Sequence, residues 1–140
     1  MSKQVFPEPT VGALIFNKKG ELFLMRSHKW RGKYVIPGGH IELGEKIEVA
    51  LKREIKEETN LNIFGLEFIC LQEFIYDKKY WKKRHFIFFD YAAKTRSIKV
   101  KLNSEGQSYV WATLKDAFKL PIEIFTKRAI LKYMELKKIR

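Results

Sequence analysis

The sequence is short of cysteine, of acidic residues and of long apolar runs. Cys70 is the only cysteine, which excludes an internal disulfide and any zinc site built from several thiolates. No stretch reaches the roughly 18 consecutive apolar residues that a membrane span requires, and the first ten residues lack the apolar segment of a signal peptide. These absences predict a cytoplasmic protein in a reducing compartment, with no membrane partner.

The shortage of acid leaves a strong positive charge. Lys and Arg number 28 against 16 Asp and Glu, so the formal net charge is +12. Such a surplus attracts polyanions, which include nucleic acid, anionic membrane surfaces and small phosphorylated ligands. Charge alone does not choose among them.

The length and the apolar content favour one folded unit. The chain has 140 residues, of which 46% are hydrophobic and 14% aromatic. Domains most often hold about 100–150 residues, and this apolar content can bury a sizeable core. No linker or internal repeat divides the chain, so we expect a single domain over residues 1–140.

The local patterns alternate between strands and helices. Short apolar runs predict strands at residues 10–16, 21–25, 62–76, 85–93, 97–102 and 108–111. Helical composition and spacing predict helices at residues 45–60 and 122–138, and glycines mark residues 32–44 as a loop. The order predicts an α/β fold, an α/β/α sandwich whose mixed sheet lies between the two helices.

Three carboxylates share one face of the first predicted helix. Glu54, Glu57 and Glu58 fall within an arc of about 100°, which also carries Ile47 and Ala50 and ends next to Leu51. The acids therefore point inward or into a cleft. Neighbouring acids are commonly solvated surface residues, but acids beside an apolar stripe need a compensating cation. Lys or Arg could supply that charge, and so could a hard divalent ion such as Mg²⁺.

Residues 39–61 resemble a known motif. Gly39, Glu45 and the run REIKEETNL from Arg53 match the Nudix box, GX5EX7REUXEEXGU with U aliphatic, except that Asn60 replaces glycine. Asn tolerates the left-handed conformation that ends a helix, so we expect the fold to accept this change. The preceding Pro-Gly-Gly and the later Glu105 also resemble MutT-like members of the Nudix hydrolase family.

The resemblance implies the Nudix fold, with its box helix and C-terminal helix on either side of the sheet, and it implies roles for individual residues. Mg²⁺, which Mn²⁺ can replace, would bind Glu54, Glu57 and Glu58 with help from the Gly38 main-chain carbonyl. Glu54 would also be the base that deprotonates water, Arg53 would orient it, and Glu45 would reinforce the loop. Glu105 resembles a further metal ligand or base, although turn acids are common and an ordinary turn residue stays equally open.

The implied activity is hydrolysis by activated water of a pyrophosphate bond in a nucleoside diphosphate linked to another moiety. A (deoxy)nucleoside triphosphate is the first candidate among such small-molecule nucleotides. Alternatives are a nucleotide sugar, a dinucleoside polyphosphate, or a basic nucleic-acid-binding or RNA-end-processing module that uses residues 78–84 and the C-terminal helix. Homodimerisation stays open.

Aromatic and basic residues around the box are candidates for substrate contact. Aromatic rings stack on nucleobases, and cations draw in phosphates. Arg26 and Arg31 belong to a fragment of the spacing found in coenzyme A-cleaving members of the family. The candidates are Arg26, Trp30, Arg31, Tyr34, Trp81 and His85.

Overall fold

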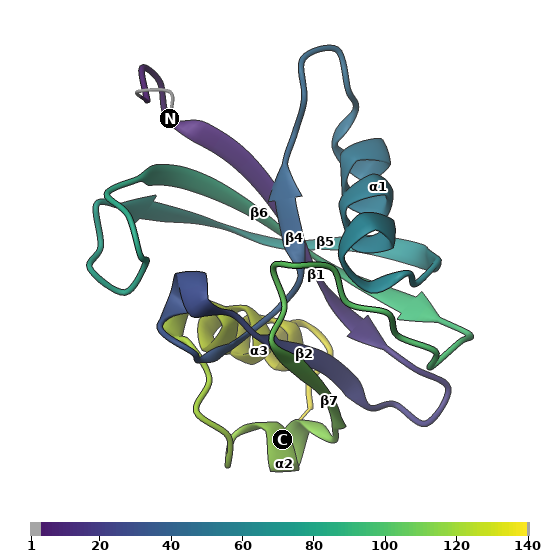
Figure 1. Cartoon of the computed structure of the whole chain (residues 1–140). Coiled ribbons are helices and arrows are strands. Elements are labelled where there is room, and N and C mark those ends of the chain that lie inside the picture. Colours follow the sequence, from purple (N-terminus) through teal and green to yellow (C-terminus); the bar gives the residue numbers. More distant parts are fainter. Residues whose placement is uncertain (1–3, 140) are drawn as a thin grey trace.

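A seven-stranded mixed sheet forms the middle layer of the computed structural model, which describes residues 4–139 (Figure 1). The strands are β1 (Glu8–Phe16), β2 (Leu22–Arg26), β3 (Tyr34–Val35), β4 (Gly38–His40), β5 (Ile63–Ile75), β6 (His85–Thr95) and β7 (Ser108–Ala112). The helices are η1 (His28–Trp30), α1 (Ile47–Thr59), α2 (Leu114–Ala117) and α3 (Ile124–Leu136). None of the described helices is long and apolar enough to cross a membrane.

The sheet divides where β1 and β2 separate. The main strand order is β3-β2-β1-β6-β5, with β1 and β6 parallel and the other pairs antiparallel. The registered contact between β1 and β2 is the pair Phe16 and Leu22, whereas the other end of β1 pairs with β4. β2 continues away from β1 and pairs with β7 and β3. This separation leaves room for a site beside β4.

Two apolar cores hold helices against opposite faces of the sheet. Alternation along β1 sends Val11, Ala13 and Ile15 into the core under α1, whereas Leu14 faces the core under α3. Leu51 and Ile55 anchor α1 in the first core, and Ala129 and Ile130 anchor α3 in the second. The predicted α/β class, with a mixed sheet between two helices, is confirmed.

The strand predicted at residues 97–102 is wrong. These residues form no strand, because their amides turn to the end of α1 rather than to a neighbouring strand: Lys101 N–H donates to Thr59 O at 3.0 Å and Asn103 N–H to Glu58 O at 3.1 Å. Alternate side chains, Val100 and Leu102, pack against the core under α1, which explains the period of two in the sequence. The segment carries Glu105 back toward the first helix.

The loop and helix boundaries differ locally from the prediction. Residues 32–44, predicted as loop, contain the short strands β3 and β4. α1 begins at Ile47, so Glu45 lies before the helix and its side chain is free to meet Arg53. Asn60 ends α1 with φ of 66°, in the left-handed region expected for this position.

Candidate active site

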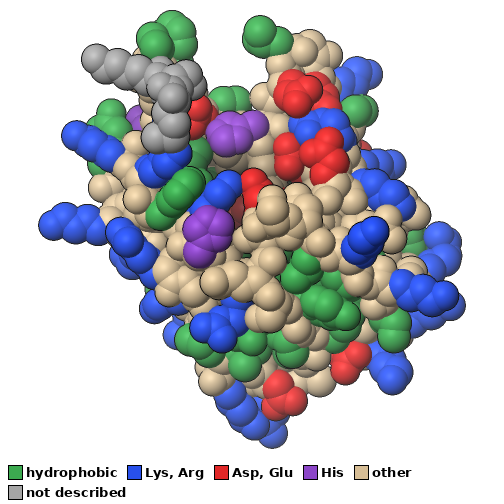
Figure 2. All heavy atoms as spheres, in the orientation of Figure 1, with side chains coloured by type: hydrophobic (Ala, Val, Ile, Leu, Met, Phe, Trp, Pro, Cys, Tyr) green, Lys and Arg blue, Asp and Glu red, His purple; other side chains and the backbone are tan. Residues whose placement is uncertain are grey.

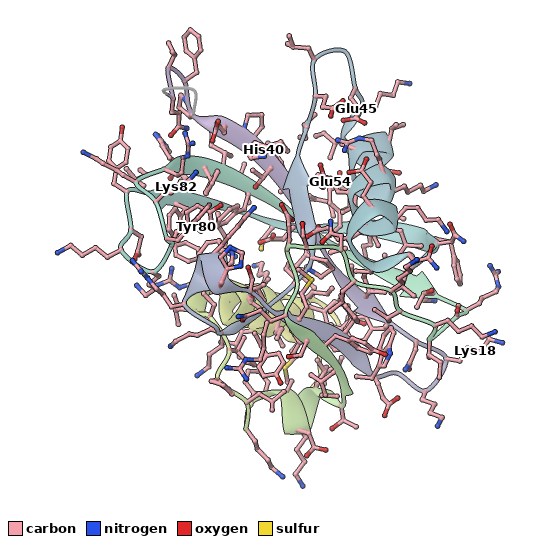
Figure 3. All side chains as sticks on the ribbon, in the orientation of Figure 1. Lys18, His40, Glu45, Glu54, Tyr80 and Lys82 are labelled. Carbon is pink, nitrogen blue, oxygen red and sulfur yellow. The ribbon has the colours of Figure 1, made fainter. Side chains whose placement is uncertain are left out.

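A cleft of about 230 Å³ lies between β4, α1 and the aromatic side chains of β6 and α3. One end is lined by Gly38, Gly39, Glu54, Glu58, Glu105 and Lys29, and the other by Trp30, Tyr80, Phe86, Phe88 and Phe125. In Figure 3, Glu54 lies on the side of α1 next to β4, and Tyr80 lies on the β5–β6 connection. The cleft therefore joins an acidic end to an aromatic end.

Glu58 is the most deeply buried acid at this end, with 3% of the residue exposed. Gly38 N–H donates to Glu58 Oε1 at 2.7 Å, and the Glu58 and Glu105 carboxyl groups share a hydrogen bond. Burial, followed by the charge of Glu105, raises the pKa of Glu58 well above its usual value. A cation that contacts both carboxylates would favour the ionised form of each.

Glu54 lies over the backbone of Gly39. A methyl group on Gly39 would overlap the Glu54 carboxylate, so this close approach requires glycine. Burial raises the pKa of Glu54, although a hydrogen bond from Arg53 opposes the change. Glycine thus sets where the carboxylate rests.

Gly39→Ala tests this placement. The atoms in the way belong to the flexible end of the Glu54 side chain, so we expect a small loss of stability and a loss of about 100-fold in kcat/KM. Steady-state kinetics and thermal unfolding give the two values. Adding Glu54→Asp, which shortens the side chain, should restore part of the activity. An active single variant would show that the close contact has no role.

Arg53 ties the start of α1 to the acids. Its Nε and Nη2 donate to the two oxygens of Glu45 at 2.7 and 2.9 Å, Nη1 donates to Glu54 Oε1 at 2.9 Å, and Nη2 reaches His40 O at 3.0 Å. Hydrogen bonds from Arg53 lower the pKa of Glu45 to about 2. Figure 2 shows acidic side chains gathered around a basic one over α1. Arg53 therefore contacts Glu45 and Glu54 at once.

Glu105 reaches the acids from the irregular segment after β6. Lys29 Nζ forms an ion pair with Glu105 Oε1 at 2.8 Å, and both residues line the cleft. Burial would raise the pKa of Glu105, but hydrogen bonds from Lys29 and Glu58 outweigh it and lower the pKa. Glu105 is thus part of the acidic end rather than an isolated turn acid.

The sequence of this chain is similar to those of known Nudix proteins. A family model described as the NUDIX domain matches residues 6–133. The chain belongs to the Nudix family. The nucleoside triphosphatase NudI of Escherichia coli K12 is 31% identical to it over 107 residues, which cover 71% of this chain and 74% of NudI.

Solved Nudix structures share the fold. The MutT protein from Methanosarcina mazei Go1 superposes with a TM-score of 0.79 at 22% identity and covers 98% of this chain and 99% of its own. A C. elegans Ap4A hydrolase superposes with a TM-score of 0.73 at 25% identity, covering 94% and 98%. The protein is a MutT-like Nudix pyrophosphohydrolase.

The prediction that three acids of the Nudix helix point inward holds for two of them. Glu58 is buried and the Glu54 side chain is 16% exposed, but the Glu57 side chain is 56% exposed and does not line the cleft. The buried face of α1 centres on Leu51 and Ile55, which places Glu57 at its outer margin. Arg53 Nη1 contacts Glu57 Oε2 at 3.4 Å, so this acid lies at the rim of the acidic end.

Trp30 alone among the six predicted substrate-contact residues lines the cleft. Arg26 donates to Gly32 O, and Arg31 donates to Lys78 O and Tyr80 O. Both arginines therefore hold backbone carbonyls of loops: Arg26 in the loop before β3 and Arg31 in the β5–β6 connection. The structure places the other three away from the cleft lining: Tyr34 packs near α3, Trp81 contacts His28 and Lys82, and His85 pairs with residue Ile75.

Apart from Trp30, the sequence analysis did not predict the aromatic end, although a signal existed. Phe86, Phe88 and Asp90 alternate along β6, so all three side chains leave the same face of the sheet and line the cleft. Gln72 and Phe125 join them from β5 and α3. An aspartate among the phenylalanines of a buried strand is costly to bury, and this cost indicates that its carboxyl group has a binding role.

Asp90 makes stability depend on pH. Burial raises its pKa to about 6, against a hydrogen bond from Gln72 that lowers it. A carboxyl whose pKa is raised on folding stabilises the fold below its unfolded pKa and loses that contribution as pH rises toward 6. Relative to the wild type, Asp90→Asn should therefore gain up to about 3 kcal/mol of unfolding free energy between pH 4 and pH 7.5.

Urea unfolding of both proteins at the two pH values measures this gain. Other acids with shifted pKa values, such as Glu58 and Glu45, titrate in both proteins and cancel in the difference. Parallel curves for the two proteins would contradict the raised pKa of Asp90.

The acidic end suits a divalent cation that keeps other ligands. Among the described residues, no group of three His, Cys, Asp or Glu side chains is arranged to hold an ion by itself. Mg²⁺ commonly takes one or two carboxylates and completes its shell with water and substrate phosphate. Buried Glu58, its partner Glu105 and nearby Glu54 provide hard oxygen donors on one side of the cleft, so the donor set fits such an ion.

Proposed function

We propose that this Nudix enzyme hydrolyses a pyrophosphate bond of (deoxy)nucleoside triphosphates with Mg²⁺, which Mn²⁺ can replace. The observation that carries the proposal is one cleft with buried acids at one end and aromatic rings at the other. Acids suit metal-bound phosphates, and rings suit a nucleobase. The similarity to NudI, a nucleoside triphosphatase, supports the same substrate class.

Glu54 and Glu58 would hold the ion, with Glu105, Glu57 at the rim and the Gly38 carbonyl as further candidate ligands. When bound, the ion supplies charge stabilisation on the phosphate oxygens and lowers the pKa of water. Glu54 is the candidate base for the attacking water, oriented by Arg53, which is itself fixed by Glu45. Glu105, held by Lys29, is the second candidate base.

Lys29 is the cation available to the substrate at this end. It lines the cleft and pairs with Glu105, and its pKa is raised because this pairing outweighs the effect of burial. A positive ammonium beside the acids would offset the charge of an incoming polyphosphate.

A metal-supplemented substrate screen tests the proposal. Purified protein with Mg²⁺ or Mn²⁺ is given nucleoside triphosphates, nucleotide sugars, dinucleoside polyphosphates and 5′-triphosphate or capped RNA, and products are identified by mass. We expect nucleoside triphosphates to be the best substrates by kcat/KM, and no turnover with excess chelator. A panel left intact with both metals would remove the proposal.

An exposed aromatic and basic loop favours RNA ends as a second candidate. Residues 76–84 join β5 to β6, and Trp81 there is 41% exposed with Lys82 Nζ 4.3 Å from its ring centroid. Exposed rings and cations are the elements of single-strand binding. Affinity for 5′-triphosphate RNA should then fall steeply with salt, and a flat dependence would exclude this candidate.

A further inference from the structure

A polar pair lies among the aromatic residues of the cleft and has no part in hydrolysis. Asp90 on β6 and Gln72 on β5 both line the cleft, next to Phe88 and Phe125, whose ring centroids are 5.7 Å apart. Asp90 is 5% exposed. Burying a carboxyl group in apolar surroundings is costly, so its position calls for an explanation.

The hydrogen bonds of the pair fix its orientation. Gln72 Nε2 donates to Asp90 Oδ2 at 2.9 Å and to Phe125 O at 2.8 Å, and Cys70 Sγ lies 3.7 Å from the same Oδ2. Both partners of the amide nitrogen are acceptors, so both of its hydrogens are used.

Two acceptor oxygens are left over. In residues 4–139, Asp90 Oδ1 and Gln72 Oε1 receive no hydrogen bond. Neither oxygen is fully shielded from solvent, so both are accessible from the cleft. The pair therefore offers acceptors, and no free donor, to whatever enters this part of the cleft.

The strand register places the pair at the right end for a base. Gly12 on β1 pairs with Asp90 on one side and with Gly38 on the other. Two strand spacings separate the Cα atoms of Asp90 and Gly38, which is roughly 10 Å. A nucleotide with its phosphates near Gly38 can therefore place its base among the rings, with an edge toward Asp90.

We propose that Asp90, held by Gln72, recognises the nucleobase of the substrate and selects guanine. The inference rests on the proposed function, since it assumes a nucleoside triphosphate in this cleft. Guanine presents two adjacent donors, N1–H and the N2 amino group, which match the two free acceptors of the pair, Asp90 Oδ1 and Gln72 Oε1.

The other common bases lack this match. Adenine and cytosine place a ring-nitrogen acceptor beside their amino group, and uracil and thymine flank a single N–H with two carbonyls. Each would bring an acceptor against the carboxylate. With a pKa of about 6, Asp90 is mainly ionised at pH 7.5, which favours a base with two donors.

Asp90→Asn gives the sharpest test. An amide offers one donor and one acceptor, which suits the N1–H and O2 of xanthine rather than the two donors of guanine. At pH 7.5 we expect the wild type to prefer GTP over ATP by at least about tenfold in kcat/KM, from one bidentate pair. In Asp90→Asn the ratio of GTP to XTP should fall by about 100-fold.

Two further variants complete the comparison. Gln72→Met removes the donor that holds Asp90, so the preference for GTP over ATP should shrink. Asp116→Asn, an exposed acid on α2 paired with Lys119, is the matched control and should keep the wild-type ratios. Thermal unfolding checks that each variant is folded. If Asp90→Asn does not fold, the inference is tested with Gln72→Met instead.

The outcomes separate this inference from the proposed function. Efficient hydrolysis of all triphosphates with GTP and ATP within threefold, or wild-type ratios in both Asp90→Asn and Gln72→Met, would overturn the guanine assignment and leave the proposed function intact. Calorimetry without metal compares GMP and AMP directly, and tighter GMP binding that Asp90→Asn abolishes would support the inference. If no triphosphate were hydrolysed but this GMP preference held, the proposed function would fail and the base site would stand.

Discussion

Glu58→Gln is expected to lower kcat/KM for nucleoside triphosphates by about a thousandfold, which corresponds to ~4 kcal/mol of transition-state stabilisation. The substitution keeps the shape of the side chain, and Gly38 N–H can still donate to the amide oxygen. It removes a negative charge that a divalent ion and its bound phosphates need. Kinetics at several Mg²⁺ concentrations and Mn²⁺ affinity by calorimetry both measure this loss.

The stability of the same variant separates chemistry from folding. Because burial raises the pKa of Glu58 well above normal, a neutral amide should leave the thermal midpoint unchanged or higher. Glu48→Gln, on the exposed face of the same helix, is the control and should keep full activity. Glu58→Gln with activity within tenfold of wild type at saturating metal would remove Glu58 from the site.

Arg53→Met is expected to lower kcat/KM by about 100-fold and to cost about 2 kcal/mol of unfolding free energy. The variant leaves Glu45 and Glu54 without the guanidinium that orients them. Arg53→Lys should recover only part of the loss, since an ammonium cannot make the paired bonds of a guanidinium to Glu45. Kinetics and urea unfolding measure the two effects.

Acid titration gives a separate signature of the same arginine. Glu45 has a lowered pKa, so its contribution to stability is present above its unfolded pKa and disappears as pH falls toward 2. Arg53→Met should flatten that part of the pH dependence, whereas Lys52→Met on the exposed face should not. A variant whose acid profile matched the wild type would show that Arg53 does not hold Glu45.

The sequence was sufficient for the part of the acidic end that lies in the Nudix box, because those residues are close together along the chain. Helical geometry relates Glu54 to Glu58 without any tertiary information, and the Nudix box adds Gly39, Glu45 and Arg53. Glu57 is exposed although it shares the arc of the other two acids. The angular position of a side chain around the helix axis predicts its direction, but not whether the sheet extends far enough to cover it. Burial at the margin of a helix depends on packing that the helix itself does not encode.

The aromatic end could not be assembled in this way. Trp30, Gln72, Phe88 and Phe125 come from four elements, and only the parallel pairing of β1 with β6 and the position of α3 bring them together. Likewise, the segment at residues 97–102 has the alternation of a strand, but its backbone partners are helical carbonyls. Sequence periodicity indicates which side chains are buried, but it does not indicate which acceptors the backbone amides bond to.

The attachment of residues 101–103 to the end of α1 links local opening to catalytic competence. Every helix leaves its last carbonyls without partners in the helix, and here Glu58 O accepts from Asn103 N–H and Thr59 O accepts from Lys101 N–H. If this segment detached, Glu105 would move away from Glu54 and Glu58 while the sheet stayed intact. The enzyme would then be inactive without being unfolded. Hydrogen exchange at those two amides therefore reports how often the protein is ready for its substrate.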